Sequence, residues 1–473
     1  MPNSNDSTNL NHNNPHIKTR YSRKTIIRLF SHLCGLSNVL DGTIRIKSPS
    51  LLISANNYNK DISNRFSFFC ANPTECKVFH ETNSLLHWQE SLKTKPLEPT
   101  TNIPFHSGWL GYFSYPETKK SDIKKIIAEF NYYPWTLCFD HQESTLNLLG
   151  TPSDTAHKLF ELLHNEGALI DKYTKHDVCD VFSTTGFNPL WSKYDYKMAF
   201  DKIQYYLRAG DCYQINLTQP YKAQYQGQST DLLEPLFTQM QPNFGGYFKG
   251  ASVKDPNNEN SGVELISLSP ERFISIDKTG RLEAKPIKGT IKRDSDSATD
   301  KLLINELMNS SKNQAENLMI VDLLRNDLSK SAIPGSVKVD KLFELESHPN
   351  VHHLVSTISA QLKPDISPAT AIAQAFPGGS ITGAPKIRAM EIINELEIEP
   401  RSLYCGSLGY FSDSGHCDFN ILIRNLEFRD GTITCWGGGG ITVDSEVNDE
   451  YEESITKIQR IMDVVESTGK SSN

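Results

Sequence analysis

The sequence predicts an α+β protein, because strand-like and helix-like segments are mixed along the chain without a regular alternation. Strand-like runs, such as the apolar, glycine-punctuated residues 108–113, occur in both halves of the chain. Helical spacing of apolar residues occurs between them, as at Leu159, Leu162 and Leu163. A doubly wound parallel sheet would require strict strand–helix–strand repeats, so the mixed order favours the α+β class.

The composition narrows the class of protein further. The chain has 473 residues, of which 38% are hydrophobic, and a formal net charge of -8. This mild acidity argues against a nucleic-acid binder, which would carry clustered Lys and Arg. No run approaches the ~20 apolar residues that span a bilayer, so no membrane segment is expected. The nine cysteines are scattered and odd in number, which is typical of reduced thiols in a cytoplasmic protein.

The chain divides into a leader and two regions. Residues 1–24 are rich in Asn and Ser, which predicts a disordered leader. A first region over 25–170 and a second over 190–465 flank a polar linker near 170–193, and we expect both regions to share one composite core. In the first region we predict strands at 51–54, 65–70 and 108–113, a hairpin of 137–140 with 145–149, and a helix over 156–166.

The second region opens with a helix predicted over 194–207. Met198, Ile203 and Leu207 form its apolar side. Gly210 is expected to close this helix as a C-cap, because glycine adopts the left-handed conformation at low cost. A strand with alternating faces follows over residues 212–218.

Two further helices are predicted near the middle of this region. The first covers 314–328, with Leu318, Val321 and Leu324 on one apolar stripe. The second opens at Pro385, which suits the first turn of a helix because proline lacks the N–H that would be unpaired there.

Acidic residues on two predicted helices suggest a metal site. Glu316 precedes the apolar stripe of the helix over 314–328, and Glu450 and Glu453 share one face of a helix over 450–464. Carboxylates from two helices would repel each other at one point unless a cation lay between them. Hard oxygen ligands without Cys or His indicate Mg²⁺. The alternative is two solvated helix faces, which are common.

Two glycine-rich runs can approach an anion closely. In residues 376–386, glycines and Ser380 precede a helix start, whose backbone N–H groups attract anions. The run lacks the ending of a Walker A loop, so a carboxylate fits better than a triphosphate. Gly438, Gly439 and Gly440 form the second cluster, where the backbone is unshielded. The alternatives are a tight turn and a strand bend.

Five other residues are candidates for chemistry. Lys288 lies in a β-like run, where a desolvated ammonium would lose its proton easily and become a nucleophile. Glu271 is a candidate general acid, and His353 is a candidate proton donor. Arg424 lies in an apolar strand predicted over 420–424, where a charge needs a partner. Tyr404 adds a hydroxyl, and its alternative role is ordinary packing in a strand over 404–410. Taken alone, each is also compatible with an ordinary surface, packing or ion-pair role.

These segments, in this order, resemble the chorismate-utilising enzymes over residues 194–461, which is more than half the chain. The resemblance implies a large two-sheet antiparallel β-sandwich flanked by helices, with Mg²⁺ as cofactor. Gln214 stands where members that add water to chorismate carry a lysine base. A neutral amide cannot deprotonate water, so the resemblance implies ammonia as the nucleophile.

A second position separates the amine-forming members. Lys288 stands where anthranilate-forming members have alanine, and its motif resembles members that make 4-amino-4-deoxychorismate for 4-aminobenzoate and folate synthesis. Two alternatives stay open. The chain could make anthranilate with Lys288 as a bystander, or it could be a non-catalytic subunit that binds chorismate.

The resemblance also implies a role for each candidate. Lys288 attacks C2 of chorismate, and Glu271, assisted by His353, protonates the leaving C4 hydroxyl. Glu316 and Glu453, supported by Glu450, hold Mg²⁺. Substrate binding falls to Gln214, Thr290, Ser380, Tyr404, Arg424, Gly438, Gly439 and Gly440.

The expected source of ammonia is a partner protein. The chain lacks the Gly-x-Cys-x-Gly turn of glutamine amidotransferases. The resemblance therefore implies a separate glutamine amidotransferase subunit. One departure from the family pattern is Asn313, where relatives usually carry a charged residue.

Overall fold

The computed structural model describes residues 16–19, 21–36, 38–39, 44–54, 65–92, 102–116, 125–165, 182–250, 262–347 and 351–469. Most of the predicted leader and part of the predicted linker lie outside these residues. The described chain already begins within the leader range, because β1 (His16–Lys18) pairs with β10 (Thr145–Gly150) and α1 starts at Arg23.

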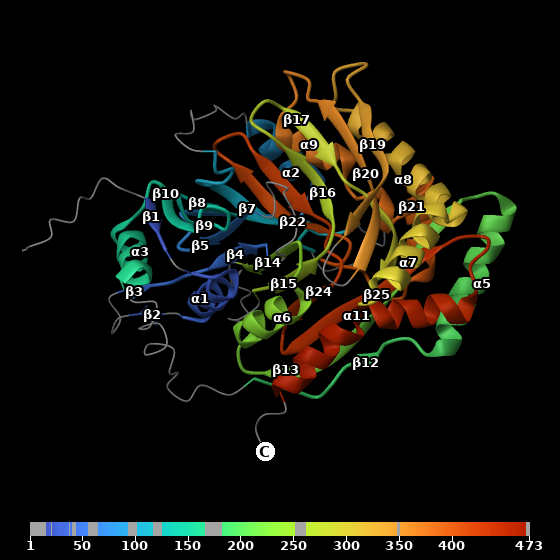
Figure 1. The fold of residues 1–473 in the computed structure, drawn as a ribbon, viewed down its shortest axis with the longest axis horizontal. Coiled ribbons are helices and arrows are strands. Elements are labelled where there is room, and N and C mark those ends of the chain that lie inside the picture. Colours follow the sequence, from blue (N-terminus) through green and yellow to red (C-terminus); the bar gives the residue numbers. More distant parts are fainter. Residues whose placement is uncertain are drawn as a thin grey trace, which may run out of the picture.

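Two large sheets form the centre of the molecule (Figure 1). In each sheet neighbouring strands run antiparallel, as β13 and β25 do in the first and β17 and β20 in the second. The first sheet has the order β1, β10, β9 (Trp135–Asp140), β5 (Phe66–Cys70), β4 (Ser50–Ile53), β14 (Phe244–Lys249), β15 (Glu264–Ser269), β24 (Asn425–Arg429), β25 (Thr432–Ile441), β13 (Gln214–Gln226) and β11 (Ser183–Thr184), with β12 (Asn188–Pro189) and β21 (Gly383–Ala384) also on β13.

The second sheet packs against the first. Its order is β18 (Ile287–Lys292), β20 (Val351–Gln361), β17 (Arg281–Ala284), β16 (Arg272–Ile276), β23 (Cys417–Asn420), β22 (Ser407–Ser412), β7 (Gly108–Phe113), β8 (Ala128–Tyr133) and β6 (Glu75–Phe79), with β19 (Lys338–Ser347) also on β20. A separate hairpin joins β2 (Asn38–Val39) to β3 (Ile44–Arg45).

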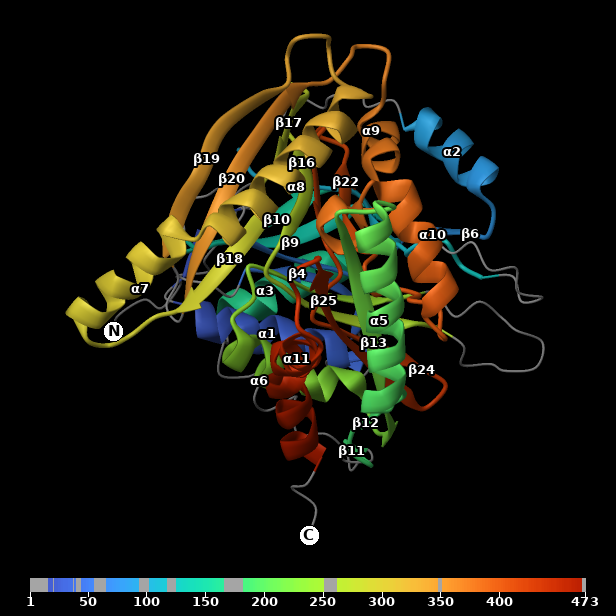
Figure 2. The same ribbon diagram turned by 90° about the vertical axis from the view of Figure 1, so that its right-hand side faces the viewer.

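Helices cover the outer faces of both sheets, as Figures 1 and 2 show. The predicted α+β fold with two antiparallel sheets is therefore confirmed. No helix in the described ranges is long and apolar enough to cross a membrane. The helices are α1 (Arg23–Gly35), α2 (Thr82–Ser91), α3 (Asp154–Asn165), α5 (Lys193–Ala209), α6 (Leu233–Met240), α7 (Ser297–Asn309), α8 (Ser311–Ser329), α9 (Pro368–Ala375), α10 (Lys386–Leu396) and α11 (Val447–Gly469), with short 3₁₀ turns η2 (Ser229–Leu232) and η3 (Gly379–Ile381).

Both regions of the chain contribute to both sheets. In the first sheet β4 pairs with β14, and in the second β7 pairs with β22. Between the sheets, alternate side chains of the facing strands form one buried cluster that includes Phe68, Tyr112, Leu265 and Tyr410. This alternation is what a strand with one face on a core requires.

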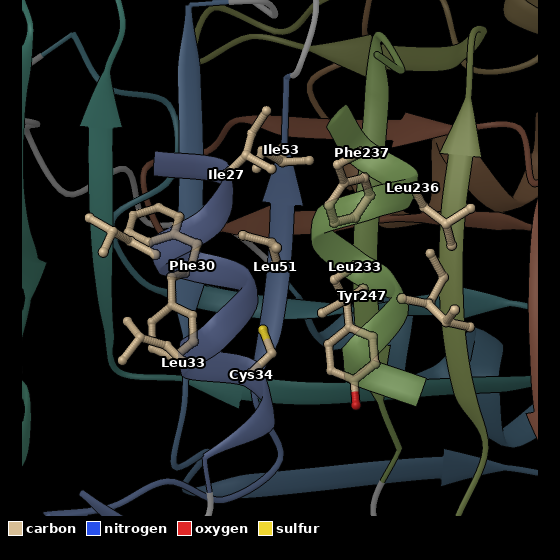
Figure 3. Packing of buried hydrophobic residues seen from close by; sticks show 14 of the residues in the cluster. Ile27, Phe30, Leu33, Cys34, Leu51, Ile53, Leu233, Leu236, Phe237 and Tyr247 are labelled. Atoms are coloured by element: carbon tan, nitrogen blue, oxygen red, sulfur yellow. The ribbon is translucent and has the colours of Figure 1, made fainter. Parts of the chain in front are cut away.

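A second apolar core lies on the outer face of the first sheet. Figure 3 shows α1 and α6 side by side over β4 and β14, with Ile27 of α1 next to Ile53 of β4. Leu233 and Phe237 of α6 complete this part of the layer. The apolar face of the amphipathic helix α1 is buried in this layer. Because α1 belongs to the first region and α6 to the second, this shared core holds the two regions together.

Two predicted helix faces are wrong in part. Met198 is 51% exposed, and α5 instead buries Tyr196 and Phe200 beside the expected Ile203 and Leu207. Leu318 is 46% exposed on α8. In both helices, the spacing of the apolar residues allowed more than one side of the helix to be buried. Contact with the sheet buried a side that excludes Met198 and Leu318. Gly210 does close α5, with a left-handed φ of 81°.

A buried ion pair fastens the loop after α10 to the first sheet. Arg401 is 1% exposed, and its Nη2 lies 2.7 Å from Oε1 of Glu397. The same guanidinium donates to the backbone oxygens of Ile381 and Asn216, at 2.9 and 2.7 Å. The Glu397 carboxylate accepts from the hydroxyl of Thr218 at 2.8 Å. Both charges are therefore compensated inside the protein.

Replacing Arg401 by Met is expected to lower the free energy of unfolding by about 3–5 kcal/mol, because it leaves the Glu397 carboxylate buried and unpaired. Urea unfolding monitored by circular dichroism measures this change. Lys197→Met is the control, since Lys197 forms an exposed pair with Asp201, and such pairs contribute about 0–1 kcal/mol. Equal stability of the two variants would contradict the prediction.

Candidate active site

The candidate site lies where the chain crosses from one sheet to the other. Glu271 connects β15 of the first sheet to β16 of the second, and Arg424 connects β23 back to β24. The N–H of Ile421 donates to the backbone oxygen of Glu271 at 3.0 Å, which joins the two crossings. Figure 2 shows α5, α8, α10 and α11 around this side of the molecule.

A β-bulge presents Lys288. In the pairing of β18 with β20, Ile287 faces Val355 and Thr290 faces His353, so β18 holds one extra residue. Gly289 has a φ of 88°, which glycine adopts easily. Lys288 lies within strand β18, as its β-like run predicted, and Lys285 and Pro286 separate this strand from β17.

Lys288 and Glu271 influence each other's protonation. Burial lowers the pKa of Lys288, and the nearby Glu316 and Glu271 carboxylates only partly offset this effect. Burial raises the pKa of Glu271 to about 7, although Lys288, a hydrogen bond from Ser380 and the charge of Arg424 all act in the opposite direction. Both shifts favour the uncharged forms, a neutral amine next to a protonated acid.

His353 lies next to this pair in the second sheet. It is 8% exposed, and its Nδ1 lies 2.8 Å from the hydroxyl oxygen of Thr290. The bulge at Gly289 brings Thr290 opposite His353. The two side chains thus restrain each other one residue after the bulge.

Arg424 and Tyr404 both depart from their expected local structure. Arg424 lies at a bend between β23 and β24, with a φ of 55°, and not within a strand. Tyr404 lies in a turn before β22 and stacks on Trp436, with ring centroids 5.5 Å apart. Glu271 and Tyr404 both influence the pKa of Arg424, which burial lowers. The guanidinium therefore lies near both residues.

The glycines of β25 bring the backbone close to side chains of β13 and of α11. A Cβ on Gly440 would lie 2.0 Å from Nε2 of Gln214, and one on Gly439 would lie 3.1 Å from Oε2 of Glu450. A Cβ on Gly438 would lie 2.4 Å from Cγ2 of Thr218. The amide of Gln214 is buried without a hydrogen-bond partner among the described residues, so it can bind an incoming polar group.

The start of α11 carries the two expected acids, Glu450 and Glu453, and one cation that the sequence motifs do not include, Lys457. Ser445 donates to Oε1 of Glu450 at 2.6 Å, and burial raises the pKa of Glu450. Nζ of Lys457 lies 2.7 Å from Oε1 of Glu453 and donates to the backbone oxygen of Gly438 at 3.1 Å. Burial opposes ionisation of Glu453, but Lys457 lowers its pKa overall. The i,i+4 spacing of Glu453 and Lys457 is compatible with this pair, but the same spacing is common on exposed helix faces.

The expected metal ligands are only partly gathered. In the described part of the chain, no three His, Cys, Asp or Glu side chains are close enough to form a metal site. Glu450 and Glu453 lie together near Gly439, while Glu316 lies near Lys288. The chemistry of these residues fits a hard cation such as Mg²⁺, because every donor is a carboxylate, and the Lys457 ammonium shows that Glu453 already attracts a positive charge.

Comparison with known proteins places the chain in a family. A family model described as chorismate binding enzyme matches residues 54–463. Because this match covers most of the chain, the chain belongs to the family of chorismate binding enzymes.

Individual relatives narrow the comparison within that family. The chain is 36% identical to aminodeoxychorismate synthase component 1 of Klebsiella aerogenes over 445 residues, covering 89% of this chain and 94% of that protein. It is 31% identical to anthranilate synthase component 1 of Bacillus subtilis (strain 168), covering 86% and 82%. Anthranilate synthase component I from Streptococcus pneumoniae TIGR4 has the same fold, with a TM-score of 0.70, 25% identity and coverage of 86% and 94%.

Proposed function

We propose that this protein aminates chorismate at C4 to give 4-amino-4-deoxychorismate, as the first component of an aminodeoxychorismate synthase. The main support is the pair formed by Lys288 and Glu271, because it combines an amine of lowered pKa with an acid whose pKa is about 7. Anthranilate formation remains the second candidate, but it gives this lysine no chemical role.

In the first step, the neutral Nζ of Lys288 forms a bond to C2 of chorismate. Both conjugated ring double bonds shift, from C1=C2 and C5=C6 to C1=C6 and C4=C5, and the bond from C4 to its hydroxyl breaks. Glu271 gives its proton to that hydroxyl, which leaves as water, and His353 assists at the same oxygen. The reaction requires an unprotonated amine and a protonated acid at the same time, which is what the shared burial of the pair favours.

In the second step, ammonia forms a bond to C4 and both ring double bonds shift back to C1=C2 and C5=C6. The bond between C2 and Nζ then breaks, and a proton from the incoming ammonium returns to the pair of Lys288 and Glu271. The buried amide of Gln214, which cannot act as a base, offers ammonia a hydrogen-bond partner without activating water.

Substrate carboxylates would contact two parts of the site. Arg424, Tyr404 and the backbone of Gly438, Gly439 and Gly440 would hold the enolpyruvyl carboxylate. Thr290 and Ser380 would contact the ring substituents. The ring carboxylate would face Lys457 and the acids of α11, since the Lys457 ammonium lies beside the glycines of β25.

We also propose that Mg²⁺ is the cofactor. Glu316, Glu450 and Glu453 would hold it, and when bound it would neutralise the negative charge of the ring carboxylate. Asn313 is neutral, so it adds no charge to this group of proposed metal ligands.

A glutamine amidotransferase subunit would supply the ammonia, so the overall reaction would be a transfer of nitrogen from glutamine to chorismate, a transaminase-type amination. The described cysteines are all free, which supports a reducing, cytoplasmic location. The product would serve 4-aminobenzoate and folate synthesis.

Product analysis tests the proposed function. The purified protein is incubated with chorismate, Mg²⁺ and ammonium at mildly alkaline pH, and the product is identified by mass spectrometry. A product that retains the enolpyruvyl group and yields 4-aminobenzoate with an added lyase would support the proposal. Anthranilate with released pyruvate would move the assignment to the second candidate. No product, with ammonium or with glutamine and an added amidotransferase, would support a non-catalytic subunit.

Removing the Glu453 carboxylate is expected to weaken the binding of Mg²⁺. Chelation is expected to abolish activity, and Mg²⁺ to restore it. Glu453→Gln is expected to raise the Mg²⁺ concentration for half-maximal activity at least about tenfold, because it removes an anionic ligand. Calorimetric titration with Mg²⁺ measures the same loss without turnover. Glu452→Gln is the matched control, since Glu452 is an exposed neighbour on α11. Equal Mg²⁺ affinity of both variants would contradict the proposed ligand set.

A further inference from the structure

Lys386 is a buried cation that the proposed chemistry does not use. It starts α10, and its side chain is 13% exposed. Its Nζ donates to Oδ2 of Asp327 at 2.5 Å and to the backbone oxygens of Ala375 and Pro377 at 2.9 and 2.8 Å. An ammonium has three N–H donors, so every one of them is used.

The two carbonyls that Lys386 binds lead directly into the turn that carries Ser380. The far end of this turn is held by other donors: Nη1 of Arg401 and the amide of Asn216 both donate to the backbone oxygen of Ile381, at 2.9 and 3.0 Å. The hydroxyl of Thr382 donates to the backbone oxygen of Gly378 at 3.0 Å. The turn is thus clamped at both ends by buried donors.

The turn also has no room to shift toward α8. A Cβ on Gly379 would lie 2.3 Å from Cδ2 of Leu323, so the backbone of the turn packs directly on that helix. Asp327, which carries the counter-charge of Lys386, lies on the same helix four residues later and is 2% exposed. Lys386 therefore links α8, the end of α9 and the turn into one unit.

Ser380 projects from this unit to the acid of the reaction. The Ser380 side chain lies close to Glu271, and its hydrogen bonding acts to lower the pKa of that acid. The other groups that face Glu271 are the charges of Lys288 and Arg424 and the N–H of Ile287. Only Ser380 among them belongs to the turn that Lys386 clamps.

We propose that Lys386 is a positioning residue for the acid of this enzyme: paired with Asp327, it fixes the Ser380 turn so that the Ser380 hydroxyl reaches the Glu271 carboxylate. This inference rests on the proposed function, because Glu271 is the proton donor only in that reaction. It assigns a catalytic consequence to a lysine that touches neither Glu271 nor the substrate site.

The test compares the pH dependence of kcat/KM in four proteins, namely the wild type, Ser380→Ala, Lys386→Met and the double variant. Loss of the Ser380 hydrogen bond removes stabilisation of the Glu271 carboxylate. The limb of the profile set by Glu271 should therefore move to higher pH by about one unit in Ser380→Ala, the size expected for a hydrogen bond to a charged group. Lys386→Met should move it in the same direction, and the double variant should move it no further.

The matched control is Lys330→Met. Lys330 binds the other oxygen of the Asp327 carboxylate, Oδ1, at 2.9 Å, and near the turn it makes a long bond of 3.4 Å to the backbone oxygen of Gln374. It shares the counter-charge of Lys386 without clamping the turn. Its pH profile should match that of the wild type.

Three results would overturn the inference: a Lys386→Met profile that matches the wild type, shifts of Ser380→Ala and Lys386→Met that add in the double variant, or an equal shift in Lys330→Met. If Lys386→Met does not fold, as judged by circular dichroism, Lys386→Gln carries the same test, because its amide keeps a donor but no charge. An inactive wild-type protein would instead contradict the proposed function itself.

Discussion

Replacing Lys288 by alanine is expected to lower kcat for chorismate amination by about 10⁴-fold or more, because the substitution removes the nucleophile and not merely a binding contact. KM for chorismate should change far less, since Arg424 and the glycines of β25 remain. Steady-state kinetics with ammonium as nitrogen donor measure both constants.

The covalent adduct between Lys288 and chorismate can also be observed directly. In the absence of ammonia, the wild-type protein with chorismate should gain the mass of chorismate minus water, and peptide mapping should place it on Lys288. Lys285→Ala is the matched control, because Lys285 lies three residues away on the same segment and pairs with Glu283 at 3.8 Å. A Lys288→Ala protein with near wild-type amination would contradict covalent catalysis.

Glu271→Gln is expected to lower kcat by about 10²- to 10⁴-fold, the usual contribution of a positioned acid. The pH dependence follows from the pKa of about 7. The acid works in its protonated form, which is the dominant form of this carboxyl below pH 7 and is depleted as the pH rises above 7. Glutamine cannot ionise, so the limb near pH 7 should disappear from the residual activity of the variant.

Glu283→Gln is the control for this experiment. Glu283 is also a partly buried carboxylate of the second sheet, but it lies on β17 and pairs with Arg272 at 3.5 Å. Its removal should leave the limb near pH 7 in place. A Glu271→Gln protein that keeps both the wild-type rate and the wild-type profile would assign the proton to another group, with His353 as the nearest alternative.

Most single elements were predictable because their determinants are local. The strand over 108–113 coincides with β7, and Gly210 ends α5 as expected. The hairpin of β9 and β10 pairs as predicted, with Leu148 opposite Leu137. Turn chemistry and alternation act over a few residues, so the sequence carries these signals in full.

Helix faces and the exact positions of charged groups were less predictable. Met198 and Leu318 have the spacing of core residues but lie on the surface, because neighbouring positions pack against the sheet instead. Arg424 follows an apolar run yet adopts a left-handed bend. Lys457 and Lys386 carry no motif that separates them from surface lysines, and only their buried surroundings reveal their contacts.

The sequence alone determined the order of the chemical groups along the chain: Gln214, Glu271, Lys288, His353, Ser380, Arg424 and the acids of the last helix. That order identifies the family, because such residue types at such spacings rarely coincide. Only the tertiary structure decided which of them share an environment. Protonation depends on burial and on charges from distant segments, so the paired shifts of Lys288 and Glu271 arise only when β18 and the crossing between the sheets are packed together.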